Sequence, residues 1–144
     1  MIQFFLIVNR TGQTRFARYY QNDPENPTFE LQVARGCITR KPSQTLFFSL
    51  KEHKIVYRVY ASLYFIIGCE PQDNEFSLLE LIQFSVECMD SYFEKVTELD
   101  LVYNLEKVHM IMDEIIVKGL ILETNHDRVL ALINGLAQKK KTVV

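Results

Sequence analysis

The spacing of the hydrophobic residues changes once along this chain of 144 residues, between residues 69 and 74. Up to residue 69, most apolar residues form short runs rich in β-branched and aromatic side chains, which are typical of β-strands. From residue 74 they recur every three or four positions, as on one face of a helix. This order predicts an α+β fold in which most of the helices follow the strands.

Five runs in the first part have the composition of strands. They span residues 2–8, 13–20, 45–50, 54–60 and 61–69. The turn sequence Asn9-Arg10-Thr11-Gly12 joins the first two as a hairpin, and Glu52-His53 supplies another turn. We therefore expect a five-stranded antiparallel sheet flanked by helices.

Two helices are expected around and after these strands. Asn26 and Pro27 can begin one that runs to about Gly36, and its expected buried residues are Phe29, Leu31 and Val33. The clearest helix runs from Asn74 to Phe93. Its expected buried stripe consists of Phe76, Leu79, Ile82, Val86, Met89 and Phe93.

The last part of the chain predicts further helices. A short segment at 98–103 leads to Asn104, the expected N-cap of a helix over 105–118 that Gly119 ends. The expected stripe of that helix is Leu105, Val108, Ile111, Met112 and Ile115. Thr124-Asn125 opens a last helix, with Val129, Leu130, Ile133 and Leu136 as its apolar members. We expect one domain over residues 1–138 and a basic tail at 139–144.

The composition limits the possible partners. A net charge of −2 lacks the basic field that nucleic-acid binding usually needs, so no nucleic acid is expected. No run approaches the roughly 20 apolar residues of a membrane-spanning helix, so any membrane association is peripheral. Ten Phe and seven Tyr are many for one small core, and this surplus favours a partner subunit, with an aromatic-rich core as the alternative.

The sequence contains no recognisable pattern of catalytic or metal-binding residues. The five glycines are scattered, so no phosphate-binding loop is expected, and the histidines and cysteines lack the short spacings of a zinc site. Cys37, Cys69 and Cys88 lie in apolar stretches, as reduced core thiols of a cytosolic protein do. We expect no cofactor and no enzymatic activity; a cysteine-dependent enzyme would require an exposed Cys69 or Cys88.

Several local sequences, taken in order, resemble the small (sigma) subunits of the heterotetrameric adaptor complexes that sort cargo into coated vesicles. They are N-R-x-G-x-T-R at 9–15, Y-R-x-Y-A-x-L at 57–63, D-N-E at 73–75, E-L-D-L at 98–101 and N-L-x-K-V at 104–108. The segments 4–6, 12–15, 107–109 and 123–125 are most similar to the sigma subunit of the fourth adaptor complex. The resemblance implies a longin-like fold. It also implies a cytosolic subunit packed against a large adaptin chain, beside a second large chain and a medium (mu) chain, on trans-Golgi or endosomal membranes.

The same resemblance implies a receptor for acidic dileucine signals in cargo peptides. The residues at the matching pocket positions are Ala61, Leu63, Val86, Val96, Leu99 and Leu101. Arg15 matches the basic residue that meets the acidic position of the peptide, and Lys95 replaces an uncharged polar residue of the family. A lysine there would either narrow the pocket or favour an acidic peptide.

Three alternatives stay open from the sequence. The apolar set also fits a plain core, and Arg15 also fits a surface charge paired with a partner subunit. Cargo recognition through the medium subunit is a second alternative. The third is a different function, that of a stand-alone longin-type regulatory module for a GTPase or a membrane-fusion protein.

Overall fold

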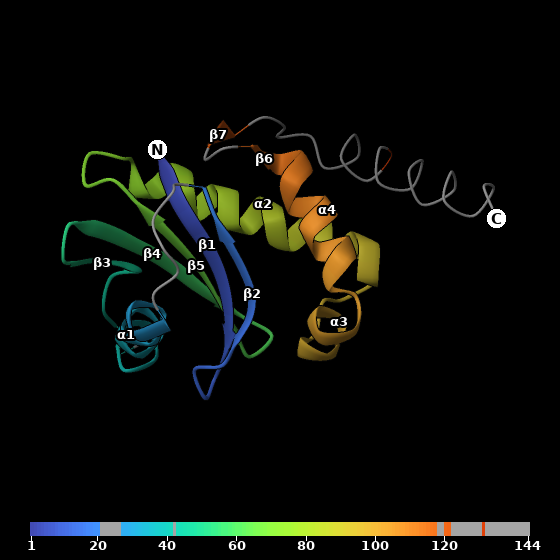
Figure 1. Cartoon of the computed structure of the whole chain (residues 1–144), viewed down its shortest axis with the longest axis horizontal. Coiled ribbons are helices and arrows are strands. Elements are labelled where there is room, and N and C mark those ends of the chain that lie inside the picture. Colours follow the sequence, from blue (N-terminus) through green and yellow to red (C-terminus); the bar gives the residue numbers. More distant parts are fainter. Residues whose placement is uncertain (21–26, 42, 118–119, 122–130, 132–144) are drawn as a thin grey trace.

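The computed structural model describes residues 1–20, 27–41, 43–117, 120–121 and 131. Its elements are β1 (Ile2–Asn9), β2 (Thr14–Tyr19), α1 (Pro27–Ile38), β3 (Phe47–Leu50), β4 (His53–Tyr60), β5 (Leu63–Cys69), α2 (Glu75–Phe93), α3 (Glu98–Tyr103), α4 (Leu105–Ile115), β6 (Ile116–Val117) and β7 (Leu120–Ile121). The first five strands form one antiparallel sheet in the order β2-β1-β5-β4-β3 (Figure 1). The predicted α+β class and five-stranded antiparallel sheet are confirmed.

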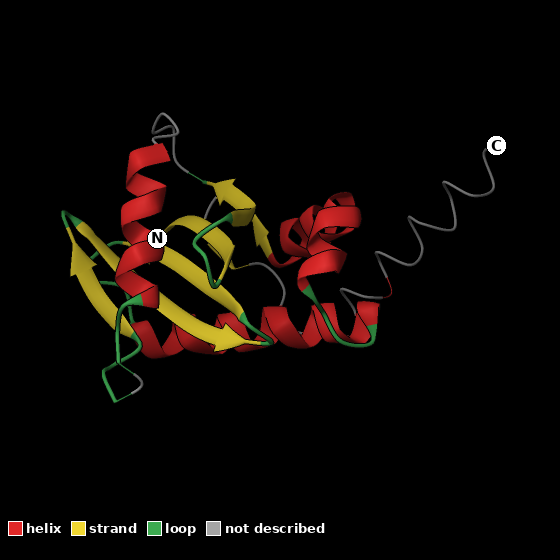
Figure 2. Ribbon diagram, turned by 90° about the horizontal axis from the view of Figure 1, so that it is seen from below, coloured by secondary structure: helices red, strands yellow, loops and turns green. Residues whose placement is uncertain are grey.

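The sheet separates two hydrophobic layers. Helix α1 lies on one face, and α2 and α4 lie on the other (Figures 1 and 2). In β1, Phe5 and Ile7 point toward α2 and α4, whereas Leu6 and Val8 point toward α1. Because both faces of β1 are covered, the strand reads as a continuous apolar run instead of an alternating one.

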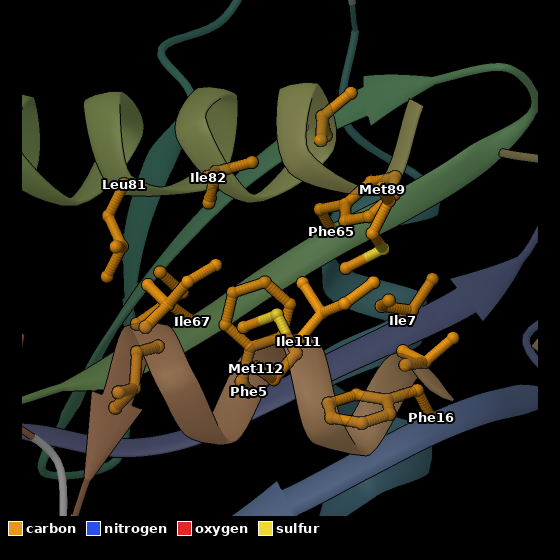
Figure 3. Packing of buried hydrophobic residues seen from close by; sticks show 14 of the residues in the cluster. Phe5, Ile7, Phe16, Phe65, Ile67, Leu81, Ile82, Met89, Ile111 and Met112 are labelled. Carbon is orange, nitrogen blue, oxygen red and sulfur yellow. The ribbon is translucent and has the colours of Figure 1, made fainter. Parts of the chain in front are cut away.

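The layer under α2 and α4 is the larger of the two. Figure 3 shows side chains of β1 and β5 between the two helices, with Phe65 of β5 beside Met89 of α2, and Ile67 of β5 in the same cluster as Ile82 of α2 and Met112 of α4. All five side chains are inaccessible to solvent. This packing fixes α4 and the segment before it relative to the sheet.

Helix α1 begins at Pro27, as predicted, and ends at Ile38, two residues beyond the expected end. Val33 is buried and Phe29 is half-buried, but Leu31 is 43% exposed, so the expectation for Leu31 was wrong. Residues two positions apart lie on opposite sides of a helix, whereas Phe29, Val33 and Cys37 share one side.

Helix α2 has the predicted length and part of the predicted buried stripe: Ile82, Val86 and Met89 are buried as predicted, whereas Phe93 is half-buried. The side chain of Asn74 caps it by accepting hydrogen bonds from the backbone N–H groups of Phe76 and Ser77. The buried residues are Leu78, Leu81, Ile82, Ser85, Val86, Cys88 and Met89. Phe76 is 68% exposed and Leu79 only half-buried, because α2 carries apolar residues on more than one side and the sheet covers only one of them.

Helix α4 ends three residues before the predicted end. Val108, Ile111, Met112 and Ile115 are buried as expected, whereas Leu105 is 39% exposed. Ile116 and Val117 pair with Ile121 and Leu120 as an antiparallel hairpin. These two β-branched residues fit an extended pair better than another helical turn.

Smaller differences concern the loops and the end of the chain. Strands β3 and β5 begin two residues later than predicted, and His53 belongs to β4. Asn104 precedes α4 as expected, but its side chain makes no capping hydrogen bond. Gly119, the expected helix after Thr124 apart from Ala131, and the tail at 139–144 lie outside the described residues, so the boundary between domain and tail stays a prediction.

Candidate functional site

A buried asparagine organises the turn between β1 and β2. Asn9 is 7% exposed, and its side-chain Oδ1 accepts hydrogen bonds from the backbone N–H groups of Thr11, at 3.1 Å, and Gln13, at 2.9 Å. Gly12 has φ of +89°, a conformation that glycine adopts without strain. The Nδ2 group of Asn9 donates to Gln13 Oε1 at 2.9 Å and also to Glu98 Oε1 at 2.8 Å, which links the turn to α3.

Arg15 of β2 meets the same carboxylate. Its Nε group donates to Glu98 Oε1 at 2.8 Å, and its terminal NH2 group donates to Gln13 Oε1 at 3.0 Å. The hydrogen bonds from Asn9 and Arg15 hold the pKa of Glu98 below its usual value. Glu98 is therefore ionised at neutral pH and forms charge-assisted contacts with the hairpin.

The position of Glu98 follows from the way α3 begins. Thr97 and Asp100 form a capping box, in which the Thr97 hydroxyl accepts from the Asp100 N–H and the Asp100 carboxylate accepts from the Thr97 N–H. This makes Glu98 the first residue of α3. The sequence T-x-x-D at 97–100 is the signal of this capping box from which the start of α3 could have been predicted.

Four of the six predicted pocket residues lie together. Leu63, Val86, Val96 and Leu101 are each at most 3% exposed and belong to one hydrophobic cluster. Leu63 pairs with Asn9 across β1 and β5, which places this group beside the Arg15–Glu98 ion pair. Other side chains of the chain cover all four, so a ligand would reach them only after a movement of that cover.

The remaining predicted residues are at the surface. Leu99 of α3 is 65% exposed, and Lys95 is exposed in the segment between α2 and α3. Ala61 is exposed in the turn between β4 and β5, with φ of +50°, and does not begin β5 as expected. The structure thus brings together Arg15 and the four buried residues, while Ala61, Leu99 and Lys95 do not join that buried group.

Comparison with known proteins identifies the family. Residues 1–140 match the family described as "Clathrin adaptor complex small chain". The chain belongs to this family. It is 43% identical over 133 residues to the mouse AP-4 complex subunit sigma-1, covering 91% of this chain and 92% of that protein. It is 41% identical over 134 residues to the AP-4 complex subunit sigma of Arabidopsis thaliana, covering 92% of this chain.

The fold comparison agrees with the family. The small chain matches a chain of a structure titled "Homology model of the full-length AP-3 complex in a stretched open conformation", with a TM-score of 0.74 and 28% identity. The match covers 99% of this chain and 97% of that chain. The predicted resemblance to sigma subunits, including that of the fourth complex, and the longin-like fold are confirmed.

The cysteines of this small chain are structural. Cys37, Cys69 and Cys88 are reduced thiols and at most 1% exposed. Burial raises the pKa of Cys37 to about 12 and that of Cys69 to about 11. The condition for a cysteine-dependent enzyme, an exposed Cys69 or Cys88, is not met.

The described part of the small chain offers no other obvious chemistry. Within those residues, no three His, Cys, Asp or Glu side chains are grouped so that they could hold a metal ion. None of the described helices combines the length and the apolar character needed to cross a bilayer.

Proposed function

We propose that this small chain is a non-enzymatic, structural subunit of a four-chain vesicle-coat adaptor that sorts cargo at trans-Golgi or endosomal membranes. The observation that carries the proposal is an exposed apolar patch on α3 and the start of α4. It consists of Leu99, Val102, Tyr103 and Leu105, which are 65%, 49%, 78% and 39% exposed. Four large apolar side chains within seven positions are unusual on a free surface and typical of a subunit interface.

The partner that this patch requires is a large adaptin chain, with the second large chain and the medium chain completing the complex. Co-expression with and without a large chain tests this. The adaptor subunit should remain in solution and co-purify with the large chain, and aggregate without it. A soluble monomer that does not bind any large chain would favour the alternative, a stand-alone regulatory module.

We further propose that the complex binds acidic dileucine peptides at the site beside Arg15. The acidic residue of the peptide would replace Glu98 as the partner of the Arg15 guanidinium, and the two leucines would enter the group of Leu63, Val86, Val96 and Leu101. Burying a leucine side chain contributes about 1.5 to 3 kcal/mol, from which ordering costs are subtracted. An isolated peptide should therefore bind weakly.

Titration of the assembled adaptor core with a peptide that has an acidic residue four positions before Leu-Leu tests the site. Arg15→Ser should weaken binding, as should Leu63→Ser, which also alters the core. Arg18→Ser is a matched control, because Arg18 lies on the same strand and pairs with Asp113 at 3.1 Å. Equal binding by native, Arg15→Ser and Leu63→Ser cores would refute the dileucine site.

A further inference from the structure

Helix α2 carries a second surface that the proposed dileucine site does not use. A groove of about 340 Å³ lies between α2 and β4. It is lined by Arg58, Phe76, Leu79, Glu80, Gln83, Phe84 and Glu87. The α2 residues among these recur every three or four positions, so they form one stripe along the helix.

The floor of the groove is apolar and incompletely covered. Phe76 is 68% exposed, whereas Leu79 and Phe84 are half-buried and pack with one side against the core under α2. A single exposed Phe is common on protein surfaces. Here it adjoins two half-covered apolar side chains in a concave surface, which can receive an apolar side chain from a partner.

The charge of α2 restricts what that partner can be. Residues 74–94 contain five carboxylate side chains and no Lys or Arg. Glu75 is paired with Lys54 at 3.0 Å, and Asp90 accepts a hydrogen bond from the Val96 N–H at 2.9 Å. Glu80 and Glu87 are exposed and line the groove, where Glu87 Oε1 accepts a hydrogen bond from Gln83 Nε2 at 3.3 Å.

The opposite wall adds one positive charge. Arg58 of β4 donates to Gln83 Oε1 at 3.4 Å, a long hydrogen bond that spans the groove. With Glu80 and Glu87 on the α2 side, the lining keeps a net negative charge. A partner segment with Lys or Arg beside its apolar residues would complement both the floor and the rim.

We propose that this groove seats an amphipathic helix of the large adaptor chain, with one apolar side chain on Phe76, Leu79 and Phe84 and flanking basic residues beside Glu80 and Glu87. A helix is the occupant that fits a stripe repeating every three or four residues, because such ridges and grooves interdigitate. This inference rests on the proposed function, since it assumes that a large chain binds. It assigns one contact with the large chain to α2, and it predicts that the contacting segment of the large chain carries an apolar residue flanked by basic ones.

A single engineered thiol tests whether the groove is covered. The three native cysteines are at most 1% exposed, so Glu80→Cys introduces the one readily reactive thiol of this chain, and labelling is read on this chain by mass spectrometry. Its labelling rate with a maleimide is measured in the complex with the large chain and in the same complex unfolded in urea. We expect labelling in the complex to be at least tenfold slower than in urea. A rate within threefold of the unfolded rate overturns the inference.

A charge-reversal pair tests the chemistry of the occupant. Glu80→Lys combined with Glu87→Lys should raise the dissociation constant for the large chain at least tenfold. The control combines Glu52→Lys with Glu94→Lys, which changes the net charge equally at exposed positions that neither line the groove nor belong to the apolar patch on α3 and α4. The control should stay within twofold of the native chain. Equal effects of the two pairs would contradict a basic occupant.

The outcomes separate this inference from the proposed function. If the native chain binds the large chain but the thiol at position 80 stays reactive, the adaptor function stands and the groove assignment is wrong. If the native chain does not bind a large chain, the proposed function itself is wrong. Protection of that thiol without the large chain, together with a doubled mass, would identify a second copy as the occupant and also overturn the inference.

Discussion

The Glu98 carboxylate receives hydrogen bonds from Asn9 and Arg15, and Arg15 is the donor that the proposed site would offer to an acidic residue of a bound peptide. Binding at Arg15 therefore requires exchange of one carboxylate for another. The net gain is smaller than for a vacant guanidinium, because the internal ion pair is lost. In the proposed site, Glu98 would therefore compete with the acidic residue of the peptide for Arg15.

Glu98→Gln is expected to tighten binding of the acidic dileucine peptide about threefold to tenfold. The amide removes the charge that competes for Arg15 but keeps an oxygen for the Asn9 side chain. Titration of the assembled core with the peptide measures the change. Glu106→Gln, an exposed change at the start of α4, should leave the affinity unaltered. Weaker binding by Glu98→Gln would contradict internal competition.

His109 gives the fold a pH dependence. Its ring packs on Phe16, with 4.6 Å between ring centroids, and burial together with the nearby Arg18 lowers its pKa, against the opposing effect of Asp113. The folded chain then binds fewer protons than the unfolded chain between the lowered pKa and the usual value near 6.5. Stability should fall as the pH drops through that window.

Hydrogen exchange of α4 amides in the complex at pH 7.5 and pH 5.5 measures this dependence, after correction for the intrinsic exchange rates. The native chain should lose protection at pH 5.5. His109→Gln should show a smaller difference between the two pH values. An unchanged difference in the variant would assign the pH dependence to other groups.

Gly68→Ala should destabilise the fold by about 1 to 3 kcal/mol, the usual cost of overfilling a core. A Cβ atom at this position would lie 2.1 Å from two ring atoms of Phe4, which is itself buried in the sheet. Gly36→Ala on α1 is the matched control, because there the nearest atom is the ring tip of the half-buried Phe48 at 2.9 Å. Denaturant midpoints should fall more for Gly68→Ala, and equal losses would contradict the role of Phe4.

At the scale of elements, two asparagines precede helices but have different roles. The Asn74 side chain accepts hydrogen bonds at the start of α2, whereas that of Asn104 makes none at the start of α4. Asn74→Ala should therefore cost about 1 kcal/mol of stability, and Asn104→Ala only a few tenths. Hydrogen exchange in the first turns of α2 and α4 distinguishes them. A larger loss from Asn104→Ala would show that capping does not explain the difference.

The sequence predicted the existence of these helices better than their faces and ends. Asn74 and Asn104 look alike in sequence, and only the backbone angles decide which side chain can reach an N–H group. Phe76 fits the three- and four-residue spacing of α2, yet other apolar positions of the helix define the side that the sheet covers. The β6–β7 hairpin was missed because two-residue strands leave almost no periodic signal.

In the candidate site, too, some residues were predicted from the sequence while their contacts were not. Arg15 and four pocket positions came from the family resemblance, and the structure places these four together beside Arg15. The contacts of Glu98 with Asn9 and with Arg15 were missed, because 89 and 83 residues separate the two members of each pair and the contacts depend on tertiary packing. The exposure of Leu99 and Ala61 likewise depends on how the turn and α3 sit on the core.

At the scale of the whole molecule, the exposed patch on α3 predicts how the chain behaves alone. Val102→Ser combined with Tyr103→Ser should reduce aggregation of the isolated chain and weaken its binding to the large chain at least tenfold. Both side chains are about half exposed or more, so their removal leaves the core intact. Light scattering and co-purification measure the two effects. Val59→Ser, on the opposite face of the sheet, is the control.

Strand β1 pairs with β5, so that Phe5 lies opposite Ile67 and Asn9 opposite Leu63. On the ribosome, β1 is made first and stays without this neighbour until more than fifty further residues have been added. Contacts so distant in sequence form slowly, and apolar strands that wait for them are prone to aggregate. Synthesis of this chain should therefore depend on chaperones that shield Phe-Phe-Leu-Ile-Val until β5 emerges.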